Sequence, residues 1–183
     1  MSPPPSRPAV PMLFVEVEGV LRKTPEDLGR PWRGPFDIEV FPDAVERLRL
    51  WKGAGGRIVG FSHQGGVALG ETDEQTAVRT LWTVRERVAN LLDHVVLCTH
   101  HPDATMPDQA RCWCRPPKPG MLIAGQHEVA LRQQEHYPIW MALLVARSPA
   151  ALQAAADLDL DHVEGDVWRR DGGVATPGVA TEE

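Results

Sequence analysis

Apolar residues follow two alternating patterns along the chain. Continuous apolar runs of the kind found in buried strands occur at residues 12–15, 57–61, 94–97 and 139–145. Segments with apolar residues every three or four positions predict helices at 42–53, 72–93, 120–135 and 149–156. A last short strand region is expected at 162–163 and 167–168. This alternation predicts an α/β fold with a parallel sheet and helices on both faces.

Local signals refine these elements. Ser148 and Pro149 have the residue types of an N-cap and a first helical position. Trp82 shares helical spacing with its apolar neighbours, so we expect it in the core, and the same spacing places Leu131 there. Residues 22–40 contain Thr-Pro and Gly-Pro turn signals and are expected to form a loop or small flap.

Length and composition favour a single domain at residues 11–170 of the 183-residue chain. The proline-rich residues 1–10 and the Gly/Ala/Thr-rich tail at 171–183 are expected to be flexible. No apolar run reaches the ~20 residues of a membrane span, and the N-terminus lacks the apolar core of a secretory signal. A net charge of −6 gives no indication of a nucleic-acid or anionic membrane partner. Together with cysteines in metal spacing, these features predict a cytoplasmic protein.

All three cysteines lie in one loop, at positions 98, 112 and 114, with His100 two residues after the first. Thiolate and imidazole are preferred zinc ligands, and four protein ligands leave no open position, so the set Cys98, His100, Cys112 and Cys114 predicts a structural zinc. His101 is the alternative fourth ligand, but Cys98 and His100 lie on the same side of an extended segment. The other interpretations are free thiols or a disulfide, and a Cys112–Cys114 bridge would close a very tight ring.

Two further clusters follow predicted strands. Glu16 and Glu18 come at the end of the first strand, directly before Gly19, which permits a sharp turn. Ser62 and the glycines at 65 and 66 follow the second strand, where a hydroxyl and approachable backbone amides suit an oxyanion. Because the carboxyl ends of parallel strands meet at one edge of the sheet, these clusters should lie together.

The zinc loop reads C-x-H-H-P … C-x-C-R-x-P-x-P-G-M, which resembles that of the haloacid dehalogenase (HAD) superfamily phosphatases. Within that superfamily it is most similar to the heptose-bisphosphate and histidinol-phosphate phosphatases. The resemblance implies a HAD-type, Rossmann-like sheet with a small cap or none. Those phosphatases carry D-x-D-G-[TV]-L after the first strand, with an aspartate nucleophile and an aspartate general acid/base. This chain has E-V-E-G-V-L, so Glu16 and Glu18 occupy the two catalytic positions in altered form.

The loop after the second strand resembles the T-N-Q-S-G-[IV]-A-x-G motif that holds a phosphate in the same phosphatases. The resemblance implies a phosphate site formed by Ser62, His63, Gly65, Arg115 and Lys118. The lysine of the family's C-R-K-P motif is displaced, because Pro116 follows Arg115 and the lysine comes two residues later.

Active relatives place magnesium-binding acids in a G-D-x-x-x-D motif after the fourth strand. Here Arg147 and Ala151 stand at the two acidic positions, so the resemblance gives no support for magnesium. We expect Arg147 to occupy the lost metal seat and to pair with Glu16, Glu18 or both. A purely structural alternative is a buried charge cluster in which the glutamates pair with Arg147 and Arg115.

Three functions fit this sequence. The first is a pseudophosphatase with a structural zinc that binds a phosphorylated ligand or a protein partner without efficient turnover. The second is an active phosphomonoesterase of the sugar-bisphosphate or histidinol-phosphate type with altered metal ligands. The third is a structural or interaction module within a larger assembly.

Overall fold

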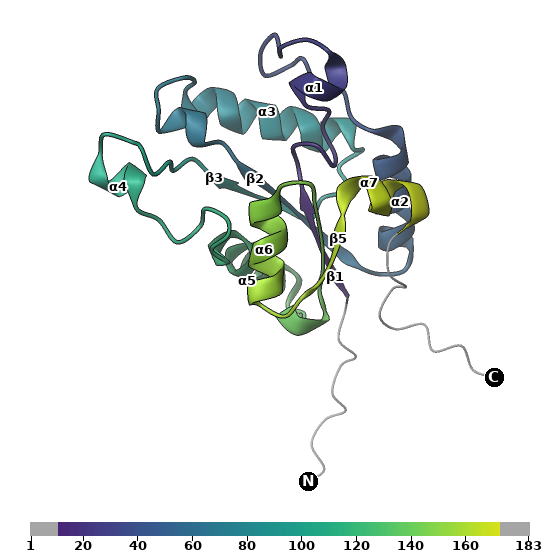
Figure 1. The fold of residues 1–183 in the computed structure, drawn as a ribbon. Coiled ribbons are helices and arrows are strands. Elements are labelled where there is room, and N and C mark those ends of the chain that lie inside the picture. Colours follow the sequence, from purple (N-terminus) through teal and green to yellow (C-terminus); the bar gives the residue numbers. More distant parts are fainter. Residues whose placement is uncertain (1–10, 173–183) are drawn as a thin grey trace, which may run out of the picture.

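The computed structural model describes residues 11–172 and contains a five-stranded parallel sheet in the order β3-β2-β1-β4-β5 (Figure 1). The strands are β1 (Met12–Glu16), β2 (Arg57–His63), β3 (His94–Cys98), β4 (Leu143–Ala146) and β5 (Asp161–Glu164). The helices are α1 (Pro25–Leu28), α2 (Pro42–Gly53), α3 (Glu74–Arg87), α4 (Pro107–Ala110), α5 (Gly120–Gln133), α6 (Pro149–Asp157) and α7 (Gly165–Asp171). The predicted flexible segments lie outside the described residues, except Asp171 and Gly172.

Helices cover both faces of the sheet, as the sequence pattern predicts. Successive residues of β1 point to opposite faces, so Leu13 and Val15 join one core cluster while Met12 and Phe14 join the other. The first cluster contains side chains of α2, α3 and α7, and the second contains side chains of α5 and α6. The central strand is therefore buried on both sides, which explains its continuous apolar run.

The central position of β1 sets the place of the site. Its neighbours are β2 and β4, with Glu16 in register with Phe61 and Val15 in register with Val145. The carboxyl ends of the three strands therefore meet at one edge of the sheet. The loops that follow them carry the side chains that the sequence singles out.

Several predicted boundaries were wrong. Residues 139–141 form a short 3₁₀ turn, so β4 begins only at Leu143. Residues 167 and 168 belong to α7, where Trp168 packs into the core as a helical side chain. Helix α3 ends at Arg87 instead of continuing to residue 93.

Two predicted core residues lie on the surface. Trp82 is 58% exposed and Leu131 is 62% exposed. Both belong to helices that flank β3, the last strand on that side of the described sheet. With no further described strand beyond β3, the outer part of each apolar stripe has nothing to cover it.

The segment between β1 and α2 forms a small flap, as predicted. It contains the single-turn helix α1, whose N-cap Thr24 and residue Asp27 form a capping box. An antiparallel bridge between Arg22 and Val40 closes the base of the flap. This flap lies beside the carboxyl end of β1 and supplies charged side chains to it.

Candidate functional site

Glu16, at the end of β1, has both carboxylate oxygens engaged by the start of α6. One oxygen accepts hydrogen bonds from the backbone amides of Arg147 (2.7 Å) and Ser148 (2.8 Å). The other accepts from the Ser148 hydroxyl at 2.5 Å. The amides at a helix N-terminus are good donors to an anion. A side chain from β1 thus completes the cap of α6.

Glu18 is held by the loop after β2. Its carboxylate accepts hydrogen bonds from the hydroxyl of Ser62 (2.9 and 3.1 Å) and from the side-chain amide of Gln64 (2.7 Å). Ser62 is fully buried. Burial raises the pKa of Glu18 from its ordinary value of 4.5 to about 7, against the opposing effects of the Ser62 hydrogen bond and of Arg22. Glu18 therefore changes charge near neutral pH.

Arg147 does not pair with the glutamates through its side chain, which corrects the sequence expectation. Its guanidinium binds Asp27 of the flap, with contacts of 2.8 and 2.9 Å. The stem of Arg147 lies over Gly19, where an added Cβ would stand 2.6 Å from Arg147 Cδ. Gly19 also has φ +78°, so both space and backbone favour glycine there. Arg147 fastens the flap to the β4–α6 loop.

The positive charge beside Glu18 comes from Arg22. The sequence had predicted Arg147 in this role. It is 3% exposed and lies 3.7 Å from the ring centroid of Trp32. Its Nε has no hydrogen-bond partner, and no ion pair of Arg22 occurs among the described residues. A buried guanidinium stacked on an aromatic ring stays charged and attracts nearby carboxylates. The alternative in which Arg147 and Arg115 neutralise the glutamates is therefore wrong.

The other predicted phosphate ligands are used within the zinc loop and its surroundings. His63 contacts the carbonyl of His100 at 2.9 Å, and Gly65 lies under the rings of His63 and His101. Arg115 contacts the carbonyl of Ala110, and the Lys118 ammonium donates to the carbonyl of Cys112 at 2.6 Å. These side chains thus brace the loop between β3 and α5. Ala151, at the second lost metal position, is 1% exposed and packs in the core beneath α6.

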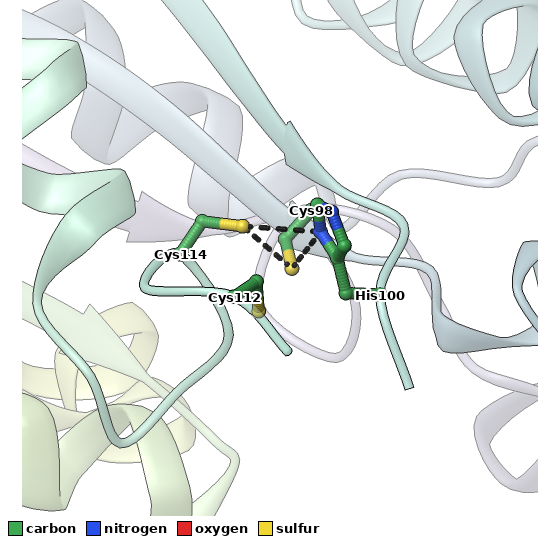
Figure 2. Close-up of side chains that lie close together, drawn as sticks. All are labelled: Cys98, His100, Cys112 and Cys114. Carbon is green, nitrogen blue, oxygen red and sulfur yellow. Dashed lines mark hydrogen bonds between the residues drawn. The ribbon is translucent and has the colours of Figure 1, made fainter. Parts of the chain in front are cut away.

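The predicted zinc ligands converge between β3 and α5 (Figure 2). Cys98 ends β3, whereas Cys112 and Cys114 follow the single turn of α4. The four ligand atoms of Cys98, His100, Cys112 and Cys114 all lie within 4.8 Å of one another. Cys114 Sγ is 3.1 Å from Cys98 Sγ and 3.3 Å from His100 Nδ1. The cysteines are free, so the disulfide alternative does not apply.

This arrangement fits a tetrahedral metal ion. Zn–S bonds of about 2.3 Å place two thiolate ligands about 3.8 Å apart, within the 4.8 Å that spans the four ligand atoms. Burial, with a further contribution from Cys114, raises the pKa of the Cys98 thiol far above its usual range. A bound dication would reverse that preference, because thiolates are the species that ligate. The cluster could therefore hold a metal such as zinc.

Close packing fixes the loop against α5. A Cβ at Gly120, the first residue of α5, would lie 2.5 Å from the carbonyl oxygen of Trp113. That oxygen accepts a hydrogen bond from the amide of Gly120. The Pro-Gly pair that begins α5 thus lets the segment between Cys112 and Cys114 sit directly on the helix, which holds two ligands in place.

Sequence comparison finds curated relatives, although no protein-family model matches the chain. The chain is 32% identical over 100 residues to the D-glycero-β-D-manno-heptose-1,7-bisphosphate 7-phosphatase of Photorhabdus laumondii, covering 52% of this chain and 53% of that protein. It is 29% identical over 137 residues to the Yersinia pestis protein of the same name, covering 72% and 70%. The match thus spans about half the length of the first relative.

Solved structures share the fold. A protein named as a HAD-like phosphatase from Mesorhizobium loti superposes with a TM-score of 0.69 at 22% identity, over 87% of this chain and 74% of that one. The chain has a HAD-like phosphatase fold. The D,D-heptose 1,7-bisphosphate phosphatase from B. bronchiseptica, solved with magnesium and phosphate, has a TM-score of 0.62 at 21% identity, over 84% and 79%. The resemblance to HAD-superfamily heptose-bisphosphate phosphatases read from the motifs is thereby confirmed.

Against this HAD-like frame, sequence reasoning missed four site residues. Gln64 and Ser148 bind Glu18 and Glu16, and Arg22 and Asp27 supply charge from the flap. Gln64 stands at the glutamine of the T-N-Q-S-G motif that the loop after β2 resembles, and could have been found there. Arg22 comes directly after the E-V-E-G-V-L motif, but nothing in the sequence shows that its side chain turns back toward Glu18.

Proposed function

We propose that this chain is a HAD-type pseudophosphatase that binds a phosphorylated small molecule at the carboxyl ends of β1, β2 and β4 and does not hydrolyse it. A structural zinc at the Cys/His cluster completes the proposal. The observation that carries it is that both Glu16 oxygens accept hydrogen bonds from the backbone amides of Arg147 and Ser148 and from the hydroxyl of Ser148, the N-cap of α6.

Phosphoryl transfer requires a nucleophile aimed at phosphorus and a cation that screens the oxygens. At the nucleophile position, Glu16 is directed at helix α6, and freeing it would leave donors of the cap unsatisfied. At the magnesium positions, Arg147 offers a cation and Ala151 a methyl group, and neither ligates a metal. A displacement of about 1 Å can cost ~10²-fold in rate, so these changes together argue against turnover.

The proposed anion cradle is the buried Ser62 hydroxyl with the side-chain amide of Gln64 and the backbone of Gly65. Glu18 occupies the first two donors in the structure. An ionised Glu18 would repel a phosphate, whereas a protonated Glu18 can donate to it. The pKa of Glu18 is about 7, so Glu18 becomes protonated as pH falls through neutrality. The affinity for an anion should therefore rise over the same pH range. Arg22 adds a positive charge beside the cradle in both states.

Two measurements test this proposal. Phosphomonoester hydrolysis should be absent with and without added Mg²⁺, and calorimetry should detect no Mg²⁺ binding. Replacement of Glu16, Glu18, Arg147 and Ala151 together by Asp should create a metal seat. Multiple turnovers by the unmodified protein would instead favour the active phosphatase, a function that the relatives' names support.

The binding half needs a separate probe. Sulfate keeps its charge over the neutral range, so its affinity reports the protein's protonation alone. It should bind more tightly at about pH 6 than at about pH 8, and Glu18→Gln should remove that difference. No sulfate binding at either pH would reject the ligand-binding proposal in favour of a structural module.

A further inference from the structure

A cavity lies away from the carboxyl ends of the strands, at the β3 edge of the sheet. It has a volume of about 280 Å³ and sits between α3, the edge strand β3 and α5. Its apolar lining consists of Val78, Leu81, Trp82, Val95 and Leu97. It shares no lining residue with the Glu16–Glu18 site or with the zinc ligands. This volume is near the lower end of the roughly 300–1,000 Å³ typical of small-molecule sites.

The polar lining of this cavity is basic throughout. Arg85 comes from α3, His94 from the start of β3 and Arg132 from the last turn of α5. No carboxylate lines the cavity. Arg132 has an exposed partner in Glu128, at 3.4 Å one turn earlier on the same helix. The two arginines provide charge complementarity to an anion beside an apolar hollow.

Arg85 has its hydrogen-bonding capacity unused. Its Nε is buried without a hydrogen-bond partner, and its guanidinium makes no ion pair among residues 11–172. Its one recorded aromatic contact is with the Trp82 ring, 5.6 Å from the centroid. A buried donor without a partner is costly, so a ligand acceptor at this position would remove a penalty. The exposed Trp82 ring beside it offers a flat apolar face.

The pKa of His94 reflects its burial and the positive charge around the cavity. Burial lowers its pKa, and the positive charges of Arg132 and Arg85 lower it further, against the opposing effect of Glu128. No hydrogen bond of the His94 ring occurs within the described part of the chain. The neutral imidazole of His94 and the unpaired guanidinium of Arg85 both line the cavity and can both donate to a bound anion.

We propose that this cavity is a binding site for a small aromatic carboxylate, with the ring against Trp82 and Leu97 and the carboxylate on Arg85. The planar guanidinium fork matches a carboxylate, and its stacking beside an indole suits a flat ligand. The proposal is independent of the phosphatase-like site and stands whether or not that site binds an anion.

Calorimetry with two probes of the same shape tests the proposal on the full chain. Naphthoate should bind, and the neutral naphthalenemethanol should bind at least about tenfold more weakly, because a charge-assisted pair is lost. Arg85→Gln should weaken naphthoate binding by a similar factor without changing the binding of the alcohol. Trp82→Ala should weaken both. The matched control is Arg79→Gln, on the same helix but outside the cavity, which should change neither.

Three results would overturn the proposal. Equal binding of the acid and the alcohol would show that charge is not recognised. An effect of Arg85→Gln no larger than that of Arg79→Gln would place the ligand elsewhere. Self-association that is lost in Trp82→Ala and unaffected by naphthoate would show that a second copy covers this face. Should Arg85→Gln fail to fold, Arg132→Gln takes its place, with the same expected loss for naphthoate alone.

Discussion

Glu18 makes the stability of the fold depend on pH in a direction opposite to that of an ordinary paired carboxylate. Its pKa is about 7 in the folded chain and 4.5 when solvated. Between these values the folded state holds a proton that the unfolded state releases. The stabilisation is therefore complete below about pH 4.5 and is lost as pH rises through 7. A pKa difference of this size corresponds to about 3 kcal/mol.

The variant Glu18→Gln isolates this effect. Glutamine has the shape of the protonated acid and keeps an acceptor for Ser62 and Gln64, but it does not titrate. Urea unfolding of both proteins at several pH values, with zinc held constant, gives the difference in free energy of unfolding. We expect the two to be nearly equal at about pH 4, with the variant more stable by about 3 kcal/mol at about pH 8.

Other titrating groups, including the side chains of the Cys/His cluster, are common to both proteins and cancel in that difference. A difference that stays flat from about pH 5 to about pH 8 would refute the reasoning, since Glu18 would then have similar pKa values in both states. A difference of opposite slope would mean that Arg22 and the hydrogen bonds outweigh burial.

Three further predictions concern the metal, the cap and the flap. Purified protein should carry about one zinc per chain, and Cys112→Ser should lose it and lower the thermal midpoint; elemental analysis of unmodified protein without zinc would contradict this. Glu16→Ala should cost about 1–3 kcal/mol in urea unfolding because the donors of Arg147 and Ser148 lose their acceptor, and unchanged stability would argue against the cap. Arg147→Met should cost under about 1 kcal/mol, because its pair with Asp27 is partly exposed, yet should speed proteolysis of the flap. A loss as large as that of Glu16→Ala would restore Arg147 as the counter-ion of the glutamates.

The sequence was sufficient to predict those features that impose a strict pattern on the residues, namely the metal-ligand cluster and the buried strands. Metal coordination restricts its ligands tightly, so the positions of Cys98, His100, Cys112 and Cys114 could be chosen before the fold was known. A strand buried on both faces must be apolar throughout, so β1 and β2 were equally clear. Convergence of Glu16 and Ser62 then followed from parallel topology.

Side-chain direction could not be predicted in the same way. Arg147 stands at the expected place, but its long side chain crosses Gly19 to reach Asp27, and that choice depends on the position of the flap. The exposure of Trp82 had a similar origin: helical periodicity marks an apolar stripe without showing whether the sheet extends beneath it. Both errors arise from neighbours distant in sequence, which local patterns do not specify.

The cap that Glu16 forms before α6 affects which substitutions this chain could accept during evolution. Asp at this position would be one methylene shorter, so single reversion toward the D-x-D pattern would sacrifice the contacts to the Arg147 and Ser148 amides. If the chain is a pseudophosphatase, that substitution would gain no activity in return while Arg147 and Ala151 occupy the positions of the metal-binding acids. Intermediates on the way back would be both weaker and inactive. If the chain is the proposed pseudophosphatase, the contacts of Glu16 with the residues before α6 would therefore hinder a stepwise return to hydrolytic activity.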